Sequence, residues 1–200
     1  MKTKHLIATV ATAASALPLS ALAHAGEHHS HGAGDAFLQA LAHPFTGADH
    51  LAAMLAVGAW SALTVTPAWR APAAFVALLV AGALGGFGGL WVPGVEPMIA
   101  ASVLVLGLLV AVQKKMPWVL AATLAGVFAF FHGAAHGQEL AGDTGMAALA
   151  ALLGMATGSA LLHLAGMGLG RAVLQRPQTL ARLAGGLTAA LGGFMLTRLA

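Results

Sequence analysis

Long apolar stretches, joined by short polar connections, form the pattern of the chain after its first 35 residues. Each stretch is close to the roughly 20 residues that a transmembrane helix needs. The pattern predicts an all-α fold, a polytopic membrane bundle of about six transmembrane helices. The spans are expected at residues 37–64, 73–92, 97–112, 118–138, 145–169 and 180–199.

The first 25 residues have a different pattern. Lys2 and Lys4 precede an apolar run that reaches Leu19, and small residues follow it. A basic start, an apolar middle and a small-x-small end are typical of a cleaved signal peptide. Cleavage fits after Ala23 or after Ala25, so residues 1–23 or slightly more are expected to be removed.

Residues 24–35, between the signal peptide and the first span, are polar and rich in histidine, with the sequence HAGEHHSHGAGD. We expect a flexible periplasmic segment that could hold metal loosely. Cleavage after Ala23 would make His24 the new N-terminus. Cleavage after Ala25 would place His28 third from a free amine, a favourable chelate for Cu²⁺ or Ni²⁺. The rest of the chain, residues 36–200, then forms one six-helix transmembrane domain.

The composition agrees with a membrane location and restricts the available chemistry. Hydrophobic residues make up 59% of the chain and charged residues only 8%, which excludes an ordinary soluble domain. Cysteine is absent. That excludes disulfides, Cys-based zinc sites and iron–sulfur clusters, so the possible metal donors are His, Asp, Glu and Met.

Positive charge is placed where it would orient the bundle. The formal net charge is +3, but the nine Lys and Arg residues are scattered and form no patch that would bind nucleic acid. Six of the seven that remain after signal cleavage lie in alternate connections, at Arg70, at Lys114 and Lys115, and between 171 and 182. Basic connections favour the cytoplasm. We therefore expect a multi-pass inner-membrane protein whose mature N-terminus and C-terminus are both periplasmic.

The first predicted span contains the motif His43-Pro44-x-x-Gly47-x-Asp49-His50. Residues seven apart lie nearly on one face of a helix, so His43 and His50 would align if both belong to the helix. Pro44 suits the first turn of a helix, which places His43 at the entrance of the span. Asp49 lies about 100° around the helix from His50. It either shares an ion between neighbouring helices or orients the His50 ring.

A second group of donors lies at the end of the fourth predicted span. His132, His136 and Glu139 follow the spacing i, i+4, i+7 and share one helix face. The first span enters from outside and the fourth leaves to outside, so the two groups are expected to converge in the outer half of the membrane. His163, on the fifth predicted span, lies deeper, and is either a packing residue or a further ligand near the inner face.

Two separate histidine and carboxylate groups in a membrane bundle predict a metal site. An ionisable side chain at the bilayer centre costs about 3 kcal/mol or more and is usually retained for function. Imidazole and carboxylate donors without thiolate suit Ni²⁺, Co²⁺, Zn²⁺ or Cu²⁺ and disfavour Cu⁺. Met54, Met155 and Met167 are expected in the core rather than in this site.

The two motifs, in this order in a cysteine-free bundle of this size, resemble the signature segments of the HupE/UreJ family. The resemblance covers essentially the whole chain, including the signal peptide and the number of spans. Members are regarded as nickel or cobalt permeases associated with hydrogenase, urease or cobalamin pathways. The resemblance implies a set of residues for metal capture: His43, Asp49, His50, His132, His136 and Glu139.

The expected function is therefore import of Ni²⁺ or Co²⁺, with Zn²⁺ and Cu²⁺ less favoured, by a protein that is not an enzyme. Its expected partners are the divalent ion and membrane lipid. No P-loop is present, so any ATP-driven step would need a partner protein. Two alternatives stay open. One is an intramembrane zinc hydrolase in which Glu139 or Asp49 activates water; the other is a membrane metal sensor whose main site is the His-rich segment.

Overall fold

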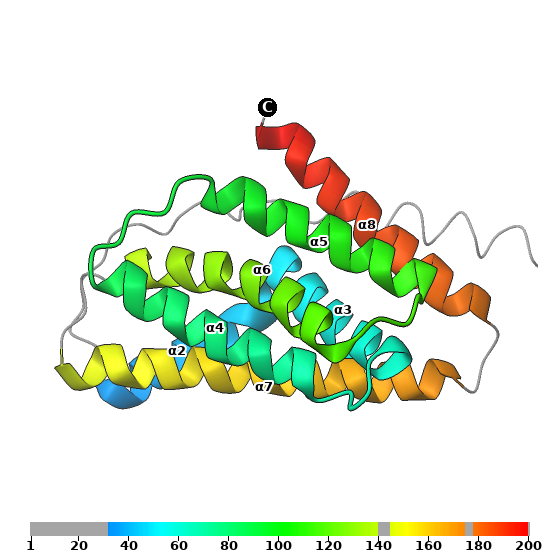
Figure 1. Cartoon of the computed structure of the whole chain (residues 1–200). Coiled ribbons are helices and arrows are strands. Elements are labelled where there is room, and N and C mark those ends of the chain that lie inside the picture. Colours follow the sequence, from blue (N-terminus) through cyan, green and yellow to red (C-terminus); the bar gives the residue numbers. More distant parts are fainter. Residues whose placement is uncertain (1–31, 140–144, 175–177, 200) are drawn as a thin grey trace, which may run out of the picture. The chain divides into compact units, whose positions relative to one another are not determined.

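The computed structural model describes residues 32–139, 145–174 and 178–199, and within these ranges every regular element is a helix, joined by short connections, with no strand (Figure 1). The predicted all-α fold is confirmed. The predicted signal peptide and residues 24–31 of the His-rich segment, with His24 and His28, lie outside the described residues, whereas residues 33–35 of that segment form the start of the first described helix. The helices are α2 (Ala33–Thr46), α3 (Ala48–Thr64), α4 (Arg70–Phe87), α5 (Val95–Val112), α6 (Trp118–Glu139), α7 (Gly145–Leu174) and α8 (Gln178–Leu199).

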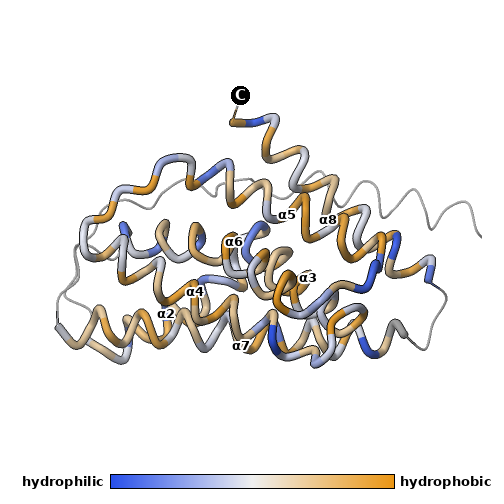
Figure 2. Tube along the Cα trace, viewed as in Figure 1, coloured by the Kyte–Doolittle hydropathy of each residue, from blue (hydrophilic) through white to orange (hydrophobic). Residues whose placement is uncertain are grey.

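Five of these helices, α4 to α8, are long and apolar enough to cross a membrane. They match the second to sixth predicted spans, usually to within three residues. The largest differences are at the ends of α4 and α7, which stop at Phe87 instead of residue 92 and at Leu174 instead of residue 169. Figure 2 shows apolar residues along all of these helices, with the more hydrophilic positions mainly near helix ends and connections. The hydropathy of the sequence is therefore sufficient to predict these five helices.

The first predicted span is not one helix, which corrects the expectation of a continuous helix from residue 37 to 64. It is divided into α2 and α3 at Gly47, whose backbone is extended, with φ −86° and ψ 124°. Pro44 lies inside α2 rather than at a first helical turn. Because proline has no N–H, it removes a helical hydrogen bond, and the helix ends two residues later. The predicted place of His43 at the span entrance is also wrong, because α2 begins ten residues before it.

The helices pack as pairs in which glycine allows backbone contact. A Cβ added at Gly82 of α4 would lie 2.1 Å from the Phe130 carbonyl oxygen of α6, and one added at Gly86 would lie 2.6 Å from that of Ala134. Residue numbers rise together along both helices, so α4 and α6 are parallel. Arg70, at the start of α4, also lies over the Trp118 ring at the start of α6, 4.1 Å from its centroid.

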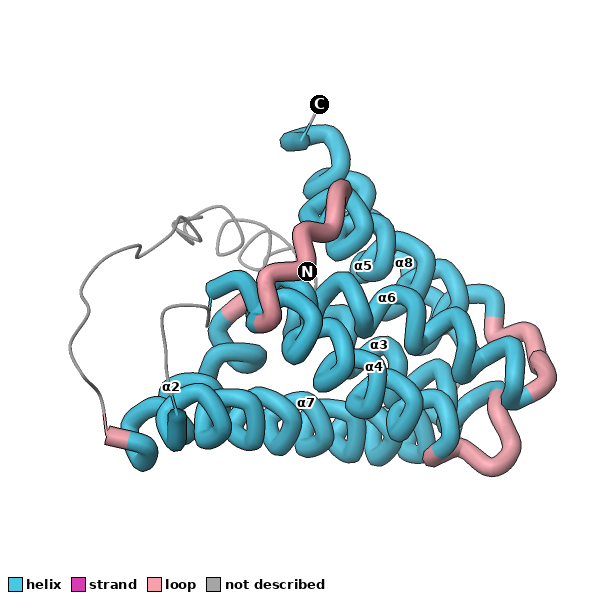
Figure 3. The backbone as a smooth tube through the Cα atoms, turned by 60° about the vertical axis from the view of Figure 1, so that its left-hand side comes forward, coloured by secondary structure: helices cyan, strands magenta, loops and turns pink. Residues whose placement is uncertain are grey.

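The other pairs follow the same principle, and small residues again make the close contacts, as is usual between membrane helices. Helix α7 runs beside α2 along its first half and beside α3 along its second half, parallel to both (Figure 1 and Figure 3). Helices α5 and α8 are antiparallel, since Gly107 packs on Ala189 and Gly185 packs on Ala111. A chain that crosses a membrane alternately requires these directions, with α2 and α3 together counting as one crossing.

Large side chains fill the space between the pairs. Trp60, Phe75 and Met54 are fully buried there, from α3 and α4. Met155 and Met167 of α7 are buried as well. The expectation that these methionines belong to the core is confirmed. Among the polar side chains described next, those of His50, His132, His136 and His163 are buried in this apolar bundle.

Candidate metal centre

Three histidines from three helices come together around one point. His43 is in the last turn of α2, His50 in the first turn of α3 and His136 in the last turn of α6. One ring nitrogen of each lies within 4.8 Å of the corresponding nitrogens of the other two. The Nε2 atoms of His50 and His136 are 2.9 Å apart. We call these three residues the three-histidine cluster.

The break at Gly47 makes this cluster possible. On a continuous helix the seven residues from His43 to His50 would separate them by about 10 Å along the axis. In the broken helix the centroids of their rings are only 5.5 Å apart. The His43 and His136 centroids are 4.8 Å apart, and those of His50 and His136 are 4.7 Å apart. The side chains of His50 and His136 are buried, whereas His43 is exposed.

Asp49 forms a hydrogen bond with the ring of His50, one of the three histidines of the cluster. Its Oδ1 lies 2.9 Å from Nδ1 of His50 and accepts the His50 backbone N–H at 2.8 Å. A carboxylate at Nδ1 holds the proton of a neutral imidazole there, so that the Nε2 lone pair faces the cluster. Of the two roles that the sequence left open for Asp49, this geometry favours orientation of the His50 ring.

Gly47 leaves room for that pair of side chains. A Cβ at this position would lie 2.8 Å from the Asp49 carboxylate and 3.2 Å from Nδ1 of His50. A side chain at residue 47 would therefore displace the carboxylate, the ring or both. The same glycine that ends α2 thus also lets Asp49 fold back against the start of α3.

His132 adjoins the cluster on its buried side. It lies one turn before His136 on α6, is fully buried, and its ring centroid is 5.0 Å from that of His50. Its Nε2 lies 2.9 Å from the hydroxyl of Ser102 on α5. Sequence reasoning missed Ser102. The available signal was a hydroxyl in the interior of a strongly apolar predicted span, but nothing in the sequence identified its partner.

His163 does not join the three-histidine cluster. It is 1% exposed, and its ring contacts Phe75 at a centroid distance of 4.8 Å. Phe75 also contacts His132, at 5.8 Å. Neither ring nitrogen of His163 makes a hydrogen bond to the described residues, although the backbone of Ser159 is close enough to interact with the ring. His163 is therefore a separate buried imidazole, one aromatic ring away from His132.

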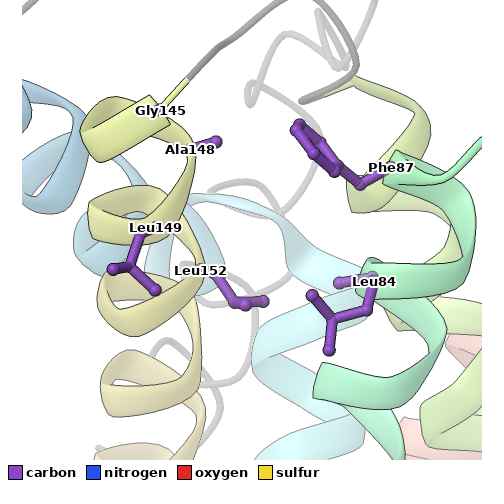
Figure 4. Close-up of a pocket in the computed structure, with 7 residues that line it drawn as sticks. Leu84, Phe87, Gly145, Ala148, Leu149 and Leu152 are labelled. Atoms are coloured by element: carbon purple, nitrogen blue, oxygen red, sulfur yellow. The ribbon is translucent and has the colours of Figure 1, made fainter.

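A pocket elsewhere in the bundle offers nothing to a metal ion. It has a volume of about 220 Å³ and lies between the end of α4 and the start of α7 (Figure 4). It is lined by alanine, glycine, leucine and phenylalanine residues: Ala83, Leu84, Phe87, Gly145, Ala148, Leu149 and Leu152. With no donor side chain in this lining, the three-histidine cluster is the better candidate for the functional site.

The three-histidine cluster can hold a divalent transition metal through imidazole nitrogen. Metal–nitrogen bonds of about 2.1 Å place two ligands about 3 Å apart when they meet at a right angle. The separation of 2.9 Å between the two Nε2 atoms suits such a pair. Three imidazoles leave further coordination positions open, which is the usual state of a site that exchanges what it binds.

Known proteins that resemble this chain place it in one family. The model of the HupE / UreJ protein family matches residues 12–195. The chain belongs to the HupE/UreJ family. It is also 41% identical to Protein HupE of Rhizobium leguminosarum bv. viciae over 190 residues, which is 94% of this chain and 96% of that protein. No solved structure matches the chain significantly.

The residues implied by the resemblance to the HupE/UreJ family fall into three groups in this structure. His43, His50 and His136 form the three-histidine cluster, while Asp49 and His132 adjoin it. Glu139 is the last residue of α6, and its side chain lies outside the described part. The two signature segments of this HupE/UreJ protein thus meet in space, and their residues His50 and His136 are 86 positions apart in sequence.

Proposed function

We propose that this HupE/UreJ protein imports Ni²⁺ or Co²⁺ across the inner membrane, and that the three-histidine cluster is where the ion is captured. The observation that carries the proposal is the approach of three ring nitrogens, from α2, α3 and α6, to within 4.8 Å of one another inside an apolar bundle. Groups of this kind are costly in hydrocarbon and are usually retained for ion or substrate pathways.

The place of the cluster in the bundle supports transport over simple storage. It lies where the first crossing is broken, and discontinuous helices commonly form ion sites near the middle of transporters. His43 is exposed while His50 and His136 are buried, so an ion would meet an accessible ligand before enclosed ones. His132 and His163 are also buried, and both rings contact Phe75.

The donors limit the choice of cargo. Imidazole nitrogen with a nearby carboxylate suits divalent ions of intermediate softness and disfavours Cu⁺. Within that group, the nickel and cobalt assignment rests on the HupE/UreJ resemblance. The termini would be periplasmic, because six of the seven Lys and Arg residues after the signal peptide lie in the alternate connections that this orientation places in the cytoplasm. A hydrogenase, urease or cobalamin pathway would then use the imported metal.

Accumulation of Ni²⁺ and Co²⁺ tests the proposal. Cells that lack their own importers would express the full chain, His50→Ala or His136→Ala at equal membrane levels, with each metal at sub-micromolar concentration. A variant without residues 26–31 controls for the His-rich segment. We expect the full chain to raise at least one metal, both histidine variants to lose that effect, and the deletion to lower uptake only when metal is scarce.

The opposite results identify the alternatives. If the full chain accumulates neither metal although the purified protein binds it, transport is wrong and the sensor or hydrolase hypothesis gains support. If the deletion abolishes all metal-dependent function while His50→Ala has no effect, the His-rich segment is the main site and the three-histidine cluster is not.

A further inference from the structure

His132 makes a hydrogen bond with only one of its two ring nitrogens. Its Nε2 is 2.9 Å from the Ser102 hydroxyl, but its Nδ1 has no hydrogen-bond partner in residues 32–139, 145–174 or 178–199. The side chain is fully buried. A polar atom that is buried and unpaired is costly, and in native proteins it calls for a specific explanation, such as a catalytic role or a bound water or ion.

The hydrogen bonds of Ser102 determine which nitrogen of His132 carries the proton. A hydroxyl has one proton to donate. Ser102 donates it to the backbone carbonyl of Ile99, at 2.6 Å, within its own helix. Its oxygen can then only accept a hydrogen bond from His132, so the proton of the neutral ring is on Nε2. Nδ1 is left with a lone pair, which is the form in which a histidine nitrogen binds a metal.

We infer that Ser102 is a positioning residue that holds His132 with Nδ1 unprotonated, so that this nitrogen receives the metal ion after the three-histidine cluster. The inference rests on the proposed function and identifies the next ligand on the path of the metal ion. The His132 ring adjoins His50, with 5.0 Å between centroids, so an ion bound at His50 is one ring away from it. His132 is not among the three residues whose nitrogens lie within 4.8 Å of one another, so it is a successive ligand and not a fourth member of the same group.

No other described group competes for the assignment of this proton. The ring neighbours of His132 are His50 and Phe75. The phenylalanine ring has no hydrogen-bonding atom, and His50 is bonded through Nδ1 to Asp49 and through Nε2 to His136. Ser102 on α5 is therefore the group that fixes the state of His132 on α6.

Nitrogen chemical shifts of the histidine rings test the inference directly. The full chain would be labelled with ¹⁵N-histidine and studied without metal in lipid nanodiscs, with the His132 signal assigned by its absence in His132→Asn. We expect the wild-type ring to be protonated at Nε2 alone. Ser102→Ala should give a mixture of both neutral forms, and Ser102→Thr, which keeps the hydroxyl, should restore the wild-type form. A wild-type ring protonated at Nδ1 would overturn the inference.

Ni²⁺ binding and uptake by the same variants provide the functional test. Partners that orient a metal-binding histidine typically contribute ten- to hundred-fold in affinity or activity, so Ser102→Ala should lose about that much and Ser102→Thr should recover it. Ser61→Ala is the matched control, because Ser61 is equally buried and its hydroxyl also donates to a backbone carbonyl, that of Ala68 at 2.6 Å, rather than pairing with a histidine. It should keep wild-type uptake.

The two levels of the proposal fail in different ways. If His50→Ala stops uptake but Ser102→Ala transports like Ser61→Ala, the role of Ser102 is wrong and the permease stands. If wild-type protein transports neither metal, the proposed function and the path through His132 are both wrong, and the nitrogen shifts then report only on the structure of the ring.

Discussion

Replacement of Asp49 by asparagine separates a carboxylate that orients a ligand from one that binds the metal itself. Asp49→Asn keeps the size of the side chain and an oxygen that can accept the proton of His50 Nδ1, now 2.9 Å away. It removes the negative charge. If Asp49 acts only through His50, the ring keeps its orientation, but its Nε2 becomes a weaker donor to the ion.

The size of the effect follows from the bonds that change. A hydrogen bond to a charged group contributes about 1.5–3 kcal/mol and one between neutral groups about 0.5–1.5 kcal/mol. The difference is about 1–1.5 kcal/mol, and every 1.4 kcal/mol is tenfold in affinity. Measured effects of such orienting partners are ten- to hundred-fold. We therefore expect Ni²⁺ affinity to fall about tenfold, with binding still measurable.

Calorimetric titration of the purified chain in nanodiscs with Ni²⁺ gives the affinity, and the metal concentration at half-maximal uptake gives an independent value. Asp35→Asn is the matched control. It makes the same charge change at an exposed residue in the first turn of α2, and it should bind Ni²⁺ like the wild type.

Two results would refute the reasoning. Loss of binding in Asp49→Asn as complete as in His50→Ala would make Asp49 a ligand in its own right. Unchanged affinity would mean that the bond between Asp49 and His50 only stabilises the start of α3.

Four further substitutions have defined outcomes. Gly47→Ala places a Cβ 2.8 Å from the Asp49 carboxylate, so Ni²⁺ affinity should fall in titrations while the melting temperature changes little; equal losses of both would contradict this. Gly133→Ala places a Cβ 1.9 Å from a backbone oxygen of α4. It should destabilise the bundle by about 1–3 kcal/mol or more, which a lower melting temperature would show. Gly186→Ala is its control, because nothing lies within 4 Å of the added Cβ, and it should be neutral or slightly stabilising. Met54→Leu conserves volume in the core and should cost less than about 1.5 kcal/mol and keep uptake, a result that Met54 as a ligand would not allow.

Hydropathy alone predicted α4 to α8, because each is a nearly uninterrupted apolar stretch bounded by charged or polar residues. The same reasoning failed at the first span. Residues 37–64 also form a mostly apolar stretch, although His43, Asp49 and His50 interrupt it, and the i, i+7 spacing of the two histidines suggests one helix face. The backbone instead becomes extended at Gly47, three residues after Pro44, and hydropathy does not register such a break.

Part of the candidate site could also be predicted from the sequence. His43, His50 and His136 were identified because ionisable groups are rare in an apolar bundle. The bond between Ser102 and His132 could not be predicted, because it joins residues 30 positions apart on two different helices. A single sequence records which residues occur on each helix but not how far each helix is rotated toward its neighbour.

The break at Gly47 also changes the electrostatics of the membrane interior. An unbroken span carries the partial charges of its ends at the two membrane surfaces. Here α2 ends within the first span, and the C-terminal end of a helix carries about half a negative charge. His43 lies in this last turn of α2, and His136 lies in the last turn of α6, so two negative helix ends approach the same cluster. The positive start of α3 is covered by Asp49, which accepts the His50 backbone N–H. The peptide groups themselves therefore add negative partial charge around the three-histidine cluster, and this charge favours a cation there.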